Sequence, residues 1–338
     1  MKYNLANRLI HIDTDLKNIY YCPYVPLLDD IIKGETKYGV KFAVKNDVSR
    51  PKKLNQKFEY YWGRDNEKQI YYEHPLLPGV KGKLLLDMSN NKYSITVNND
   101  YYFFARYKFE NVLPPGQHLT NLITLKLLEN SFLTLHCGAF SDKNTKKGYL
   151  VLGASNTGKS YTTFKALNKG FQYHSEDLTI LDIDNIYTTP LISGQSDKLP
   201  NKNFALKYNL FIYKMIGINA ILPKIPTKMN FRKFFNTQDI DSVSSLNKIF
   251  ILEKGQNSIH KLNKNESIRK MQILNRMELS YMKDPLLLAY SYFNKSFSVQ
   301  NLVEKENKLI SQIATKSEIF LVRSNIPGDY FDLISKLI

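Results

Sequence analysis

Cysteine is almost absent from this sequence, which has only two among its 338 residues. Cys22 and Cys137 lie far apart and lack the close spacing of metal ligands. This scarcity argues against a disulfide framework and is typical of a protein kept in a reducing compartment. We therefore expect the chain to be cytoplasmic.

Long hydrophobic runs are also lacking. The most apolar stretch, Asn209–Leu222, is interrupted by Lys214 and is too short to cross the hydrocarbon core of a bilayer. The first residues do not combine a basic segment with an apolar run, so a signal peptide is not predicted either. We expect a soluble protein with no membrane partner.

Acidic residues are in deficit, with 31 Asp and Glu against 47 Lys and Arg, which gives a formal net charge of +16. The lysines are spread over the whole chain, and no known nucleic-acid-binding motif accompanies them. Because a nucleic-acid site normally shows a basic stripe or a recognisable binding fold, we interpret the excess as a solvated surface and do not expect nucleic acid as a partner. Such a surface would still steer an anionic substrate or a nucleotide towards a site.

The length and composition predict two folded domains. Hydrophobic residues make up 43% of the sequence and charged residues 23%, which favours a folded core over disorder. The chain is longer than one hydrophobic core usually supports. We place a β-rich N-terminal domain at 1–115 and an α/β domain at 116–338, because Pro114-Pro115-Gly116 marks a break. The Lys- and Asn-rich segment 193–245 is interpreted as an insertion in the second domain.

The N-terminal part is rich in strand patterns. Lys83–Met88 and Lys92–Val97 flank the turn residues 89–91 and predict a β-hairpin, which Tyr101–Phe109 is expected to extend as a third strand. The aromatic residues at 58–62 could form a stacking platform, but packing in a core or an interface is their more ordinary role.

The second part alternates strand and helix patterns. Apolar residues at helical spacing from Leu119 predict a helix that ends near Asn130. A strand at 149–152, a loop, a helix at Gly158–Asn168 and a strand at 178–181 follow, in the order of a phosphate-binding βαβ unit. Further strands are expected at 248–252, 258–262 and 319–322, and further helices at 266–277, 286–293, 302–313 and 330–338.

The loop of this βαβ unit carries the most informative motif. Its residues match the pattern G-x-x-x-x-G-K-[ST] of phosphate-binding loops, between an apolar strand and a helix. Four fixed positions would coincide by chance in about 1% of chains of this length. We therefore predict that ATP binds here with Mg²⁺. The expected nucleotide contacts are Gly153, Ala154, Ser155, Asn156, Thr157, Gly158, Lys159, Ser160 and Tyr161.

The chemistry of a polyphosphate explains these residue types. Glycines let backbone N–H groups approach the phosphates, and the helix that begins near Lys159 turns its positive end towards them. Lys159 is expected to reach the β- and γ-phosphates, and the Ser160 hydroxyl to take one position on Mg²⁺. Thr162 and Thr163 are expected to serve helix packing.

Two pairs of acidic residues are candidates for the carboxylate that such a site needs. Glu176 and Asp177 are expected to open the strand after the helix, whereas Asp182 and Asp184 follow apolar residues as in a conventional Walker B strand. Asn185 comes next, so the second pair also fits a surface turn. We favour Glu176 and Asp177, because an unpaired charge at the start of a buried strand would be costly.

Three spaced elements occur in a recognisable order: His136 in LTLHCGAF, the loop GASNTGKS, and Gly170 followed by Ser175-Glu176-Asp177. Together they resemble the catalytic domain of HPr kinase/phosphorylase and its kinase-like relatives, which include serine kinases that tailor ribosomal peptides. The likeness covers roughly residues 119–338 and extends to Leu252–Gly255 and Leu321–Arg323. It implies an α/β P-loop fold of the HPr kinase/PEP carboxykinase type, preceded by a β-rich N-terminal domain.

The resemblance also implies roles for individual residues. Glu176, where the family usually has Asp, would be the general base. Asp177 would assist Mg²⁺ and the phosphates, and His136 would orient one of the carboxylates. His174 matches no family position and is interpreted as structural. Arg232 could supply a charge to the transferring group, although a place on a solvated basic face is the simpler interpretation. The related enzymes form homo-oligomers, so a homo-oligomer is compatible with the resemblance.

The sequence therefore predicts an ATP- and Mg²⁺-dependent kinase that transfers the γ-phosphoryl group to a hydroxyl of a peptide, a protein serine or a small metabolite. The glycine-rich segment that true HPr kinase/phosphorylases carry after the acidic pair is lacking, so an acceptor other than HPr is expected. An ATPase with Asp182 as its metal carboxylate is one alternative. A nucleotide-binding interaction module that has lost catalysis is another.

Overall fold

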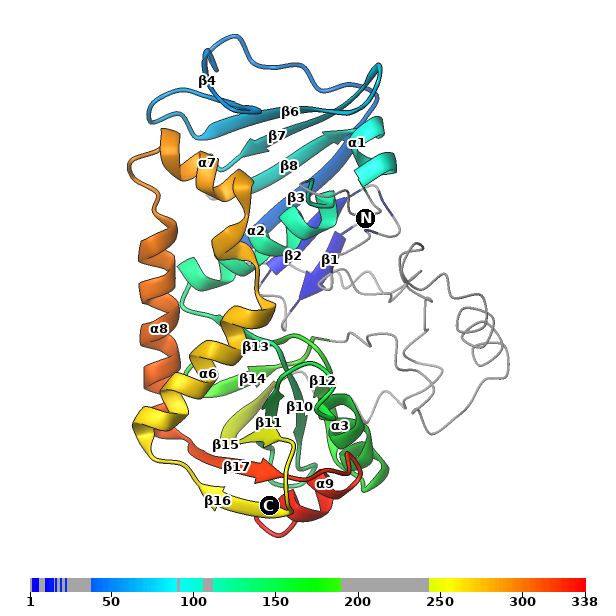
Figure 1. Ribbon diagram of the computed structural model, residues 1–338, viewed down its shortest axis with the longest axis vertical. Helices are drawn as coiled ribbons and strands as arrows, with labels where there is room; N and C mark the ends of the chain where they lie inside the picture. Colours follow the sequence, from blue (N-terminus) through cyan, green and yellow to red (C-terminus); the bar gives the residue numbers. More distant parts are fainter. Residues whose placement is uncertain are drawn as a thin grey trace, which may run out of the picture. The chain divides into compact units, whose positions relative to one another are not determined.

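The computed structural model describes residues 2–5, 10–14, 16, 19, 22, 38–89, 92–105, 112–189 and 243–338. These residues form a mixed α/β structure with two mixed β-sheets (Figure 1). They divide into two compact units. The first holds the described residues up to Asn130 together with Leu279–Lys305, and the second holds those of Ser131–Glu278 together with Glu306–Ile338. The domain boundary near residue 115 stays a prediction.

In the first unit, the described residues form a sheet of eight strands in the order β1-β2-β3-β8-β7-β6-β5-β4. The strands are β1 Lys2–Leu5, β2 Ile10–Thr14, β3 Tyr38–Lys45, β4 Gln56–Phe58, β5 Tyr61–Gly63, β6 Gln69–Leu77, β7 Val80–Asp87 and β8 Lys92–Asn98. β3 runs parallel to β2 and to β8, and the other neighbours are antiparallel. The predicted hairpin is confirmed as β7 and β8, which pair from Leu84 opposite Val97 to Asp87 opposite Ser94.

The helices of the first unit are α1 Asn99–Phe104, α2 Pro115–Glu129, the 3₁₀ helix η5 Tyr281–Lys283, and α7 Pro285–Phe293. α2 contacts β3 and β8, and α7 contacts β5 and β6. The helix predicted to end near Asn130 is thus confirmed as α2, and it is buried along most of its length. Burial requires its polar side chains to be paired. The His118 ring accordingly lies 2.9 Å from the buried Asp284 carboxylate, and Asn121 donates to the same group at 2.7 Å.

The expected third strand at Tyr101–Phe109 is wrong where the structure describes it, because Asn99–Phe104 is helical. Asn98 is the N-cap of this helix. Its side-chain oxygen accepts a hydrogen bond from the Tyr101 N–H at 3.1 Å. The run Asn-Asn-Asp suits both a hairpin turn and a helix cap, since each uses a short polar side chain to bind a nearby N–H. Residues 106–109 lie outside the described residues.

The second unit is built on a sheet that includes nine described strands. They are β9 Leu133–Leu135, β10 Cys137–Ser141, β11 Lys147–Gly153, β12 Gln172–Ser175, β13 Thr179–Leu181, β14 Asn185–Tyr187, β15 Val243–Glu253, β16 Ser258–Lys261 and β17 Glu318–Arg323. β15 lies between β11 and β17 and is parallel to both, whereas β10 runs antiparallel to β11 and to β12. The three parallel strands read as continuous apolar runs, which is typical of strands buried on both faces.

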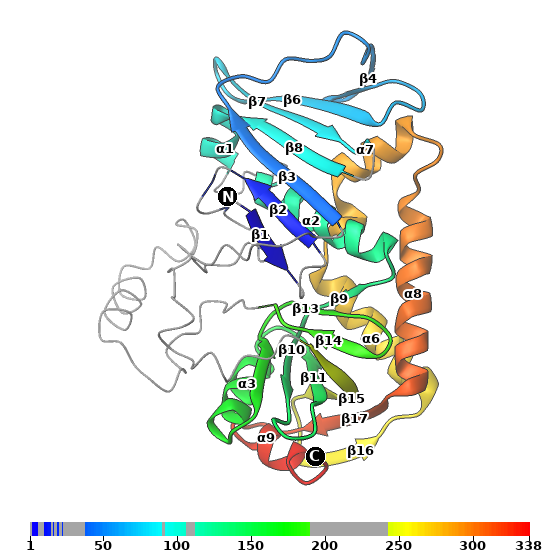
Figure 2. The same ribbon diagram turned by 180° about the vertical axis from the view of Figure 1, so that it is seen from behind.

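Helices cover both faces of these parallel strands. α3 Lys159–Asn168 and α9 Asp329–Ile334 lie side by side over one face (Figure 1, Figure 2). There Leu252 and Val322 pack into a core with Phe331 of α9. α6 Lys264–Glu278 serves the other face, where Ile251, the neighbour of Leu252, lines a pocket with Leu274 of α6. The last long helix, α8 Val299–Lys316, contributes residues to both units.

The other sequence predictions for this part are mostly confirmed. The strands predicted at 248–252, 258–262 and 319–322 correspond to β15, β16 and β17, and the four later helices correspond to α6, α7, α8 and α9. The predicted insertion 193–245 lies outside the described residues up to position 242, and Arg232 lies outside them too. None of the helices in the described part of the chain has the length and apolar character needed to span a membrane.

Candidate phosphate-binding site

The strand directions bring four chain segments to one edge of the second sheet. β11 ends at Gly153, and β15, parallel to it, ends at the same edge. β10 runs the opposite way and begins there, with Cys137 opposite Leu152. β12 is antiparallel to β10, so it ends at this edge too, with Ser175 opposite Ala139. His136, the loop after Gly153 and the pair Glu176-Asp177 therefore converge, because they adjoin the ends of three neighbouring strands.

The loop between β11 and α3 is tightly folded and needs its glycines. A Cβ atom on Gly153 would lie 2.6 Å from the Thr157 hydroxyl oxygen and 3.1 Å from the Leu252 carbonyl oxygen. Gly158 has a φ of 114°, a conformation that residues with a Cβ rarely adopt. The Thr157 hydroxyl donates to the Ala154 carbonyl at 2.8 Å and closes the turn. The motif glycines are thus required by the backbone itself.

The loop leads directly into the N-terminus of α3, which has the properties of an anion site. Its N-cap is Gly158, which offers no side-chain acceptor, and its first turn contains no acidic residue. The first N–H groups of a helix have no acceptor within the helix, and together they carry a partial positive charge. Thr162 and Thr163 are buried, and their hydroxyls donate to the carbonyls of Gly158 and Lys159. Both therefore serve helix packing, as predicted.

Lys159 places a buried ammonium group against the loop. Only 7% of the residue is exposed, and Nζ donates to the carbonyl of Gly153 at 2.8 Å and to that of Ala154 at 3.3 Å. Burial lowers the pKa of Lys159, and the carboxylates of Glu278, Asp177 and Glu176 oppose this shift. The ammonium is therefore a costly buried charge with acidic groups around it, which is the arrangement expected at a functional site.

The predicted acidic pair does not open a strand, because β12 precedes it and β13 follows it. β12 was missed since its sequence, QYHS, has no clear apolar alternation. The two carboxylates differ in access: Glu176 is only 1% exposed, whereas the Asp177 side chain is 31% exposed. Asp177 Oδ1 lies 3.4 Å from Nδ1 of His136. Burial lowers the pKa of His136, and the Asp177 carboxylate pulls it back upwards.

Two residues of α6 that the sequence did not indicate also belong to this site. The Ser155 hydroxyl donates to Oε1 of Glu278 at 2.6 Å, and Glu278 acts electrostatically on both Lys159 and His136. The Asn275 side chain accepts from the His136 N–H at 3.4 Å. The one available signal is that Glu278 ends a helix, where a negative charge is unfavourable. Such a residue needs a compensating partner or a function.

The competing carboxylates are engaged elsewhere. Asp182 accepts from the N–H groups of Asp184 and Asn185, both at 2.7 Å, and from the Tyr187 hydroxyl at 2.7 Å. It therefore holds the turn between β13 and β14. Asp184 is exposed and forms an ion pair with Lys316. This is the surface-turn interpretation, and it leaves neither residue at the loop.

The remaining predicted residues occupy different surroundings. Ser160 is half-buried in the first turn of α3, and Tyr161 beside it is 37% exposed. His174 is buried, and its ring contacts the hydroxyls of Thr188 and Ser244, so its structural role is supported. Within the described ranges, no group of three or more His, Cys, Asp or Glu side chains is placed to hold a metal ion.

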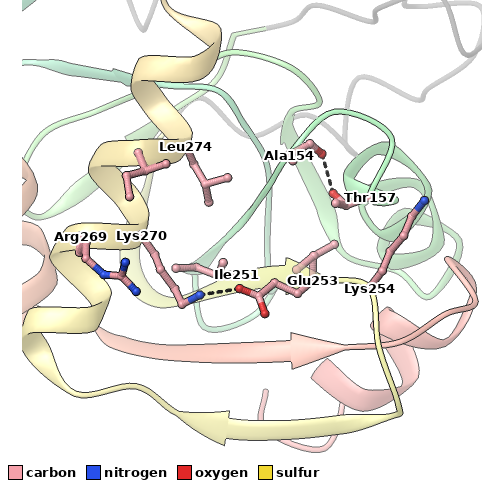
Figure 3. Close-up of a pocket in the computed structure, with 10 residues that line it drawn as sticks. Ala154, Thr157, Ile251, Glu253, Lys254, Arg269, Lys270 and Leu274 are labelled. Carbon is pink, nitrogen blue, oxygen red and sulfur yellow. Dashed lines mark hydrogen bonds and ion pairs between the residues drawn. The ribbon is translucent and has the colours of Figure 1, made fainter.

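A pocket of about 460 Å³ lies beside the loop in the second unit (Figure 3). The loop contributes Ala154 and Thr157 to its wall, the carboxyl end of β15 contributes residues 251–253, and Lys254 follows directly after the strand. α6 supplies the opposite wall with Arg269, Lys270, Ile273 and Leu274. The site thus combines a glycine-dependent loop at a helix N-terminus, a cluster of carboxylates and an adjoining cavity.

Comparison with known proteins adds little to this geometry. No protein-family model matches the sequence, and no curated protein matches it. Among solved structures, the HPr(Ser) kinase/phosphatase from Coxiella burnetii is similar over 38% of this chain and 76% of that chain, with 15% sequence identity and a TM-score of 0.23. A likeness at this level establishes neither the fold nor the family, so the residues themselves must support a functional assignment.

Proposed function

We propose that the second unit binds Mg·ATP at the loop Gly153–Ser160 and transfers its terminal phosphoryl group to a hydroxyl of a peptide, a protein or a small molecule. The observation that carries this proposal is the convergence at one sheet edge of a glycine-dependent loop, a buried ammonium and a pair of adjacent carboxylates. Phosphoryl transfer requires mainly positioning and charge neutralisation, which these groups are suited to provide.

Each group has a distinct part in this proposal. The N–H groups at the start of α3 bind the phosphates, and Lys159 moves from its loop carbonyls to the β- and γ-phosphates. The Ser160 hydroxyl offers one ligand to Mg²⁺, an ion that keeps most of its other positions for water and phosphate oxygens. Mg²⁺, when bound, neutralises charge on those phosphates.

The proton of the acceptor hydroxyl needs a carboxylate that can touch it. The resemblance assigns this role to Glu176, but Glu176 is almost fully buried and Asp177 is the more accessible of the two. We therefore assign the role of general base to Asp177, which His136 orients. The Glu176 carboxylate then stabilises the charged form of Lys159. As the acceptor oxygen bonds to phosphorus, its proton passes to Asp177, and the bond from phosphorus to the ADP oxygen breaks.

The proposal is tested with [γ-³²P]ATP and a lysate as the source of acceptors, read for labelled acceptor and for free phosphate. Lys159→Ala should lose Mg·ATP binding in calorimetry, while Lys169→Ala, at the far end of the same helix, should keep it. Asp177→Asn should keep nucleotide binding but reduce transfer by about 10²-fold or more, the usual contribution of a positioned base. Glu176→Gln should cost less than Asp177→Asn.

Several outcomes would contradict the proposal. If the wild-type protein gave no heat with Mg·ATP at millimolar concentration, or if Lys159→Ala bound it equally well, nucleotide binding would be wrong. Release of free phosphate without a labelled acceptor would indicate an ATPase. Loss of that release in Asp182→Asn would return the metal role to Asp182.

A further inference from the structure

The orientation of the loop indicates what the pocket beside it faces. The Lys159 ammonium lies against the carbonyls of Gly153 and Ala154, at the beginning of the loop. Because this lysine reaches the β- and γ-phosphates in loops of this kind, the terminal phosphate is expected at the same end. Ala154 also lines the pocket. The pocket therefore adjoins the reacting end of the nucleotide, where the acceptor must approach.

The pocket wall has an excess of positive charge. Glu253 is paired with Lys270 (Figure 3), and its other side is bound by Arg323 at 3.2 Å. Lys254 and Arg269, which also line the pocket, have no ion pair or side-chain hydrogen bond with any residue in the described part of the chain. Figure 3 shows them at opposite ends of the pocket, so each is available to a different part of a ligand, since the wall's own carboxylate is already neutralised.

The same pocket has an apolar side. Ile251 on the strand and Leu274 on the helix line it, and Ile273, also in the wall, is 46% exposed. Its volume of about 460 Å³ lies in the range of pockets that enclose small ligands. A ligand that fits such walls has an apolar part and a negatively charged part.

We propose that this pocket holds the phosphoryl acceptor, and that the acceptor carries an anionic group close to the hydroxyl that is phosphorylated. Lys254 and Arg269, which lie at opposite ends of the pocket (Figure 3), attract negative charge at its two ends, and the apolar wall between them holds carbon atoms of the acceptor. An acidic peptide and a small hydroxy acid share this chemistry. The inference rests on the proposed function, because it names the substrate class of the same site.

The test uses wild-type protein, [γ-³²P]ATP and hydroxyl probes that differ only in charge. Three pentapeptides carry a central serine flanked by four Glu, four Gln or four Lys residues, and glycerate is compared with glycerol. The anionic probe of at least one pair should be phosphorylated with a kcat/KM at least tenfold above its neutral partner. Preference within the peptides indicates a peptide acceptor, and preference for glycerate indicates a small acid.

Charge reversal in the pocket provides the second measurement. In the double variant Arg269→Glu and Lys254→Glu, the preference for the anionic probe should disappear, and the Lys peptide should gain. The matched control, Lys264→Glu with Lys308→Glu, makes the same charge change at exposed positions that do not line the pocket and should keep the preference. Unfolding midpoints of both variants verify that they are folded.

The inference is overturned if a neutral or cationic probe is the better substrate, if no anionic probe is labelled, or if the double variant keeps the anionic preference. It is also overturned if the double variant weakens binding of ATP but not of inorganic triphosphate, because the pocket would then hold the nucleoside. Binding of Mg·ATP to the wild type is measured separately. If the wild type does not bind Mg·ATP, the proposed function itself is refuted. If it binds Mg·ATP normally and one of these contradicting outcomes is found, only this inference is refuted.

Discussion

Glu278 is expected to oppose nucleotide binding through its charge. Its carboxylate accepts a hydrogen bond from Ser155 in the loop, so it lies next to the groups that would surround the phosphates. Two unit charges about 4 Å apart interact by about 1 kcal/mol in water and about 4 kcal/mol near a protein surface. The Glu278 side chain is partly exposed, so the interaction should lie near the lower of these values. Neutralising Glu278 is therefore expected to strengthen Mg·ATP binding by about 1.4 kcal/mol, or tenfold in Kd.

The substitution Glu278→Gln isolates this effect, because glutamine keeps an oxygen that can accept from Ser155. We expect Mg·ATP to bind roughly tenfold more tightly to this variant in calorimetry at low salt. The gain should shrink towards 0.5 M salt, since the Debye length falls from about 10 Å at 0.1 M to about 3 Å at 1 M. Free ATP, which carries more charge than Mg·ATP, should gain more.

Two matched variants distinguish charge from structure. Glu266→Gln removes the same charge from the first turn of the same helix, about 18 Å away along its axis, and should leave Kd unchanged. Ser155→Ala removes the hydrogen bond but keeps the charge, and should change Kd less than Glu278→Gln does. If Glu278→Gln bound Mg·ATP with unchanged or lower affinity, the carboxylate would not act as an opposing charge at this site.

Two further predictions concern protonation. Burial lowers the pKa of His136 and the Asp177 carboxylate opposes that shift, so Asp177→Asn should lower this pKa further, whereas Asp182→Asn should not change it; NMR titration of the imidazole measures both, and an unchanged pKa in Asp177→Asn would contradict the contact. Burial alone would raise the pKa of Asp284, but His118 and the hydrogen bonds from Asn121 and the Leu286 N–H outweigh it and hold the pKa below its ordinary value. The stability that Asp284 contributes is thus present above its unfolded-state pKa and is lost as pH falls through the lower folded-state pKa. Asp284→Ala, which leaves His118 Nδ1 and the Asn121 amide without their acceptor in the core, should cost about 3–5 kcal/mol near neutral pH and remove this acid-side loss, as urea unfolding at several pH values would show; a cost below about 1 kcal/mol would mean that the pair is not buried as described.

Local patterns predicted much of the second unit because the relevant interactions are local in the sequence. The strands β11, β15 and β17 contain continuous apolar runs because these runs are buried on both faces, and this shows in each strand's sequence. The loop needs Gly153 because a Cβ there would meet Thr157 of the same loop, and it needs Gly158 because of its positive φ. The short polar strand β12 and the helix α1 were missed, because QYHS has no periodicity and Asn98 can begin a turn or a helix.

The sequence favoured Glu176 and Asp177 as the carboxylates of the site, but it could not exclude Asp182. Asp182 follows an apolar strand, as a metal-binding aspartate would, but its hydrogen bonds commit it to a turn. The antiparallel direction of β10 brings His136 to the loop, and the end of β12 brings Asp177 to His136. These relations depend on which strands are neighbours and which way they run.

The sequence by itself predicted one segment, Gly153–Ser160, as a phosphate-binding loop, because the glycines and the helix start that such a loop needs lie in contiguous residues. Only the tertiary structure decided which groups face that segment. Glu278 follows Ser155 by 123 positions and still accepts its hydrogen bond, and the pocket joins the loop to cations on α6 and directly after β15. Contacts of this kind are set by strand order and helix packing, and no local pattern records them.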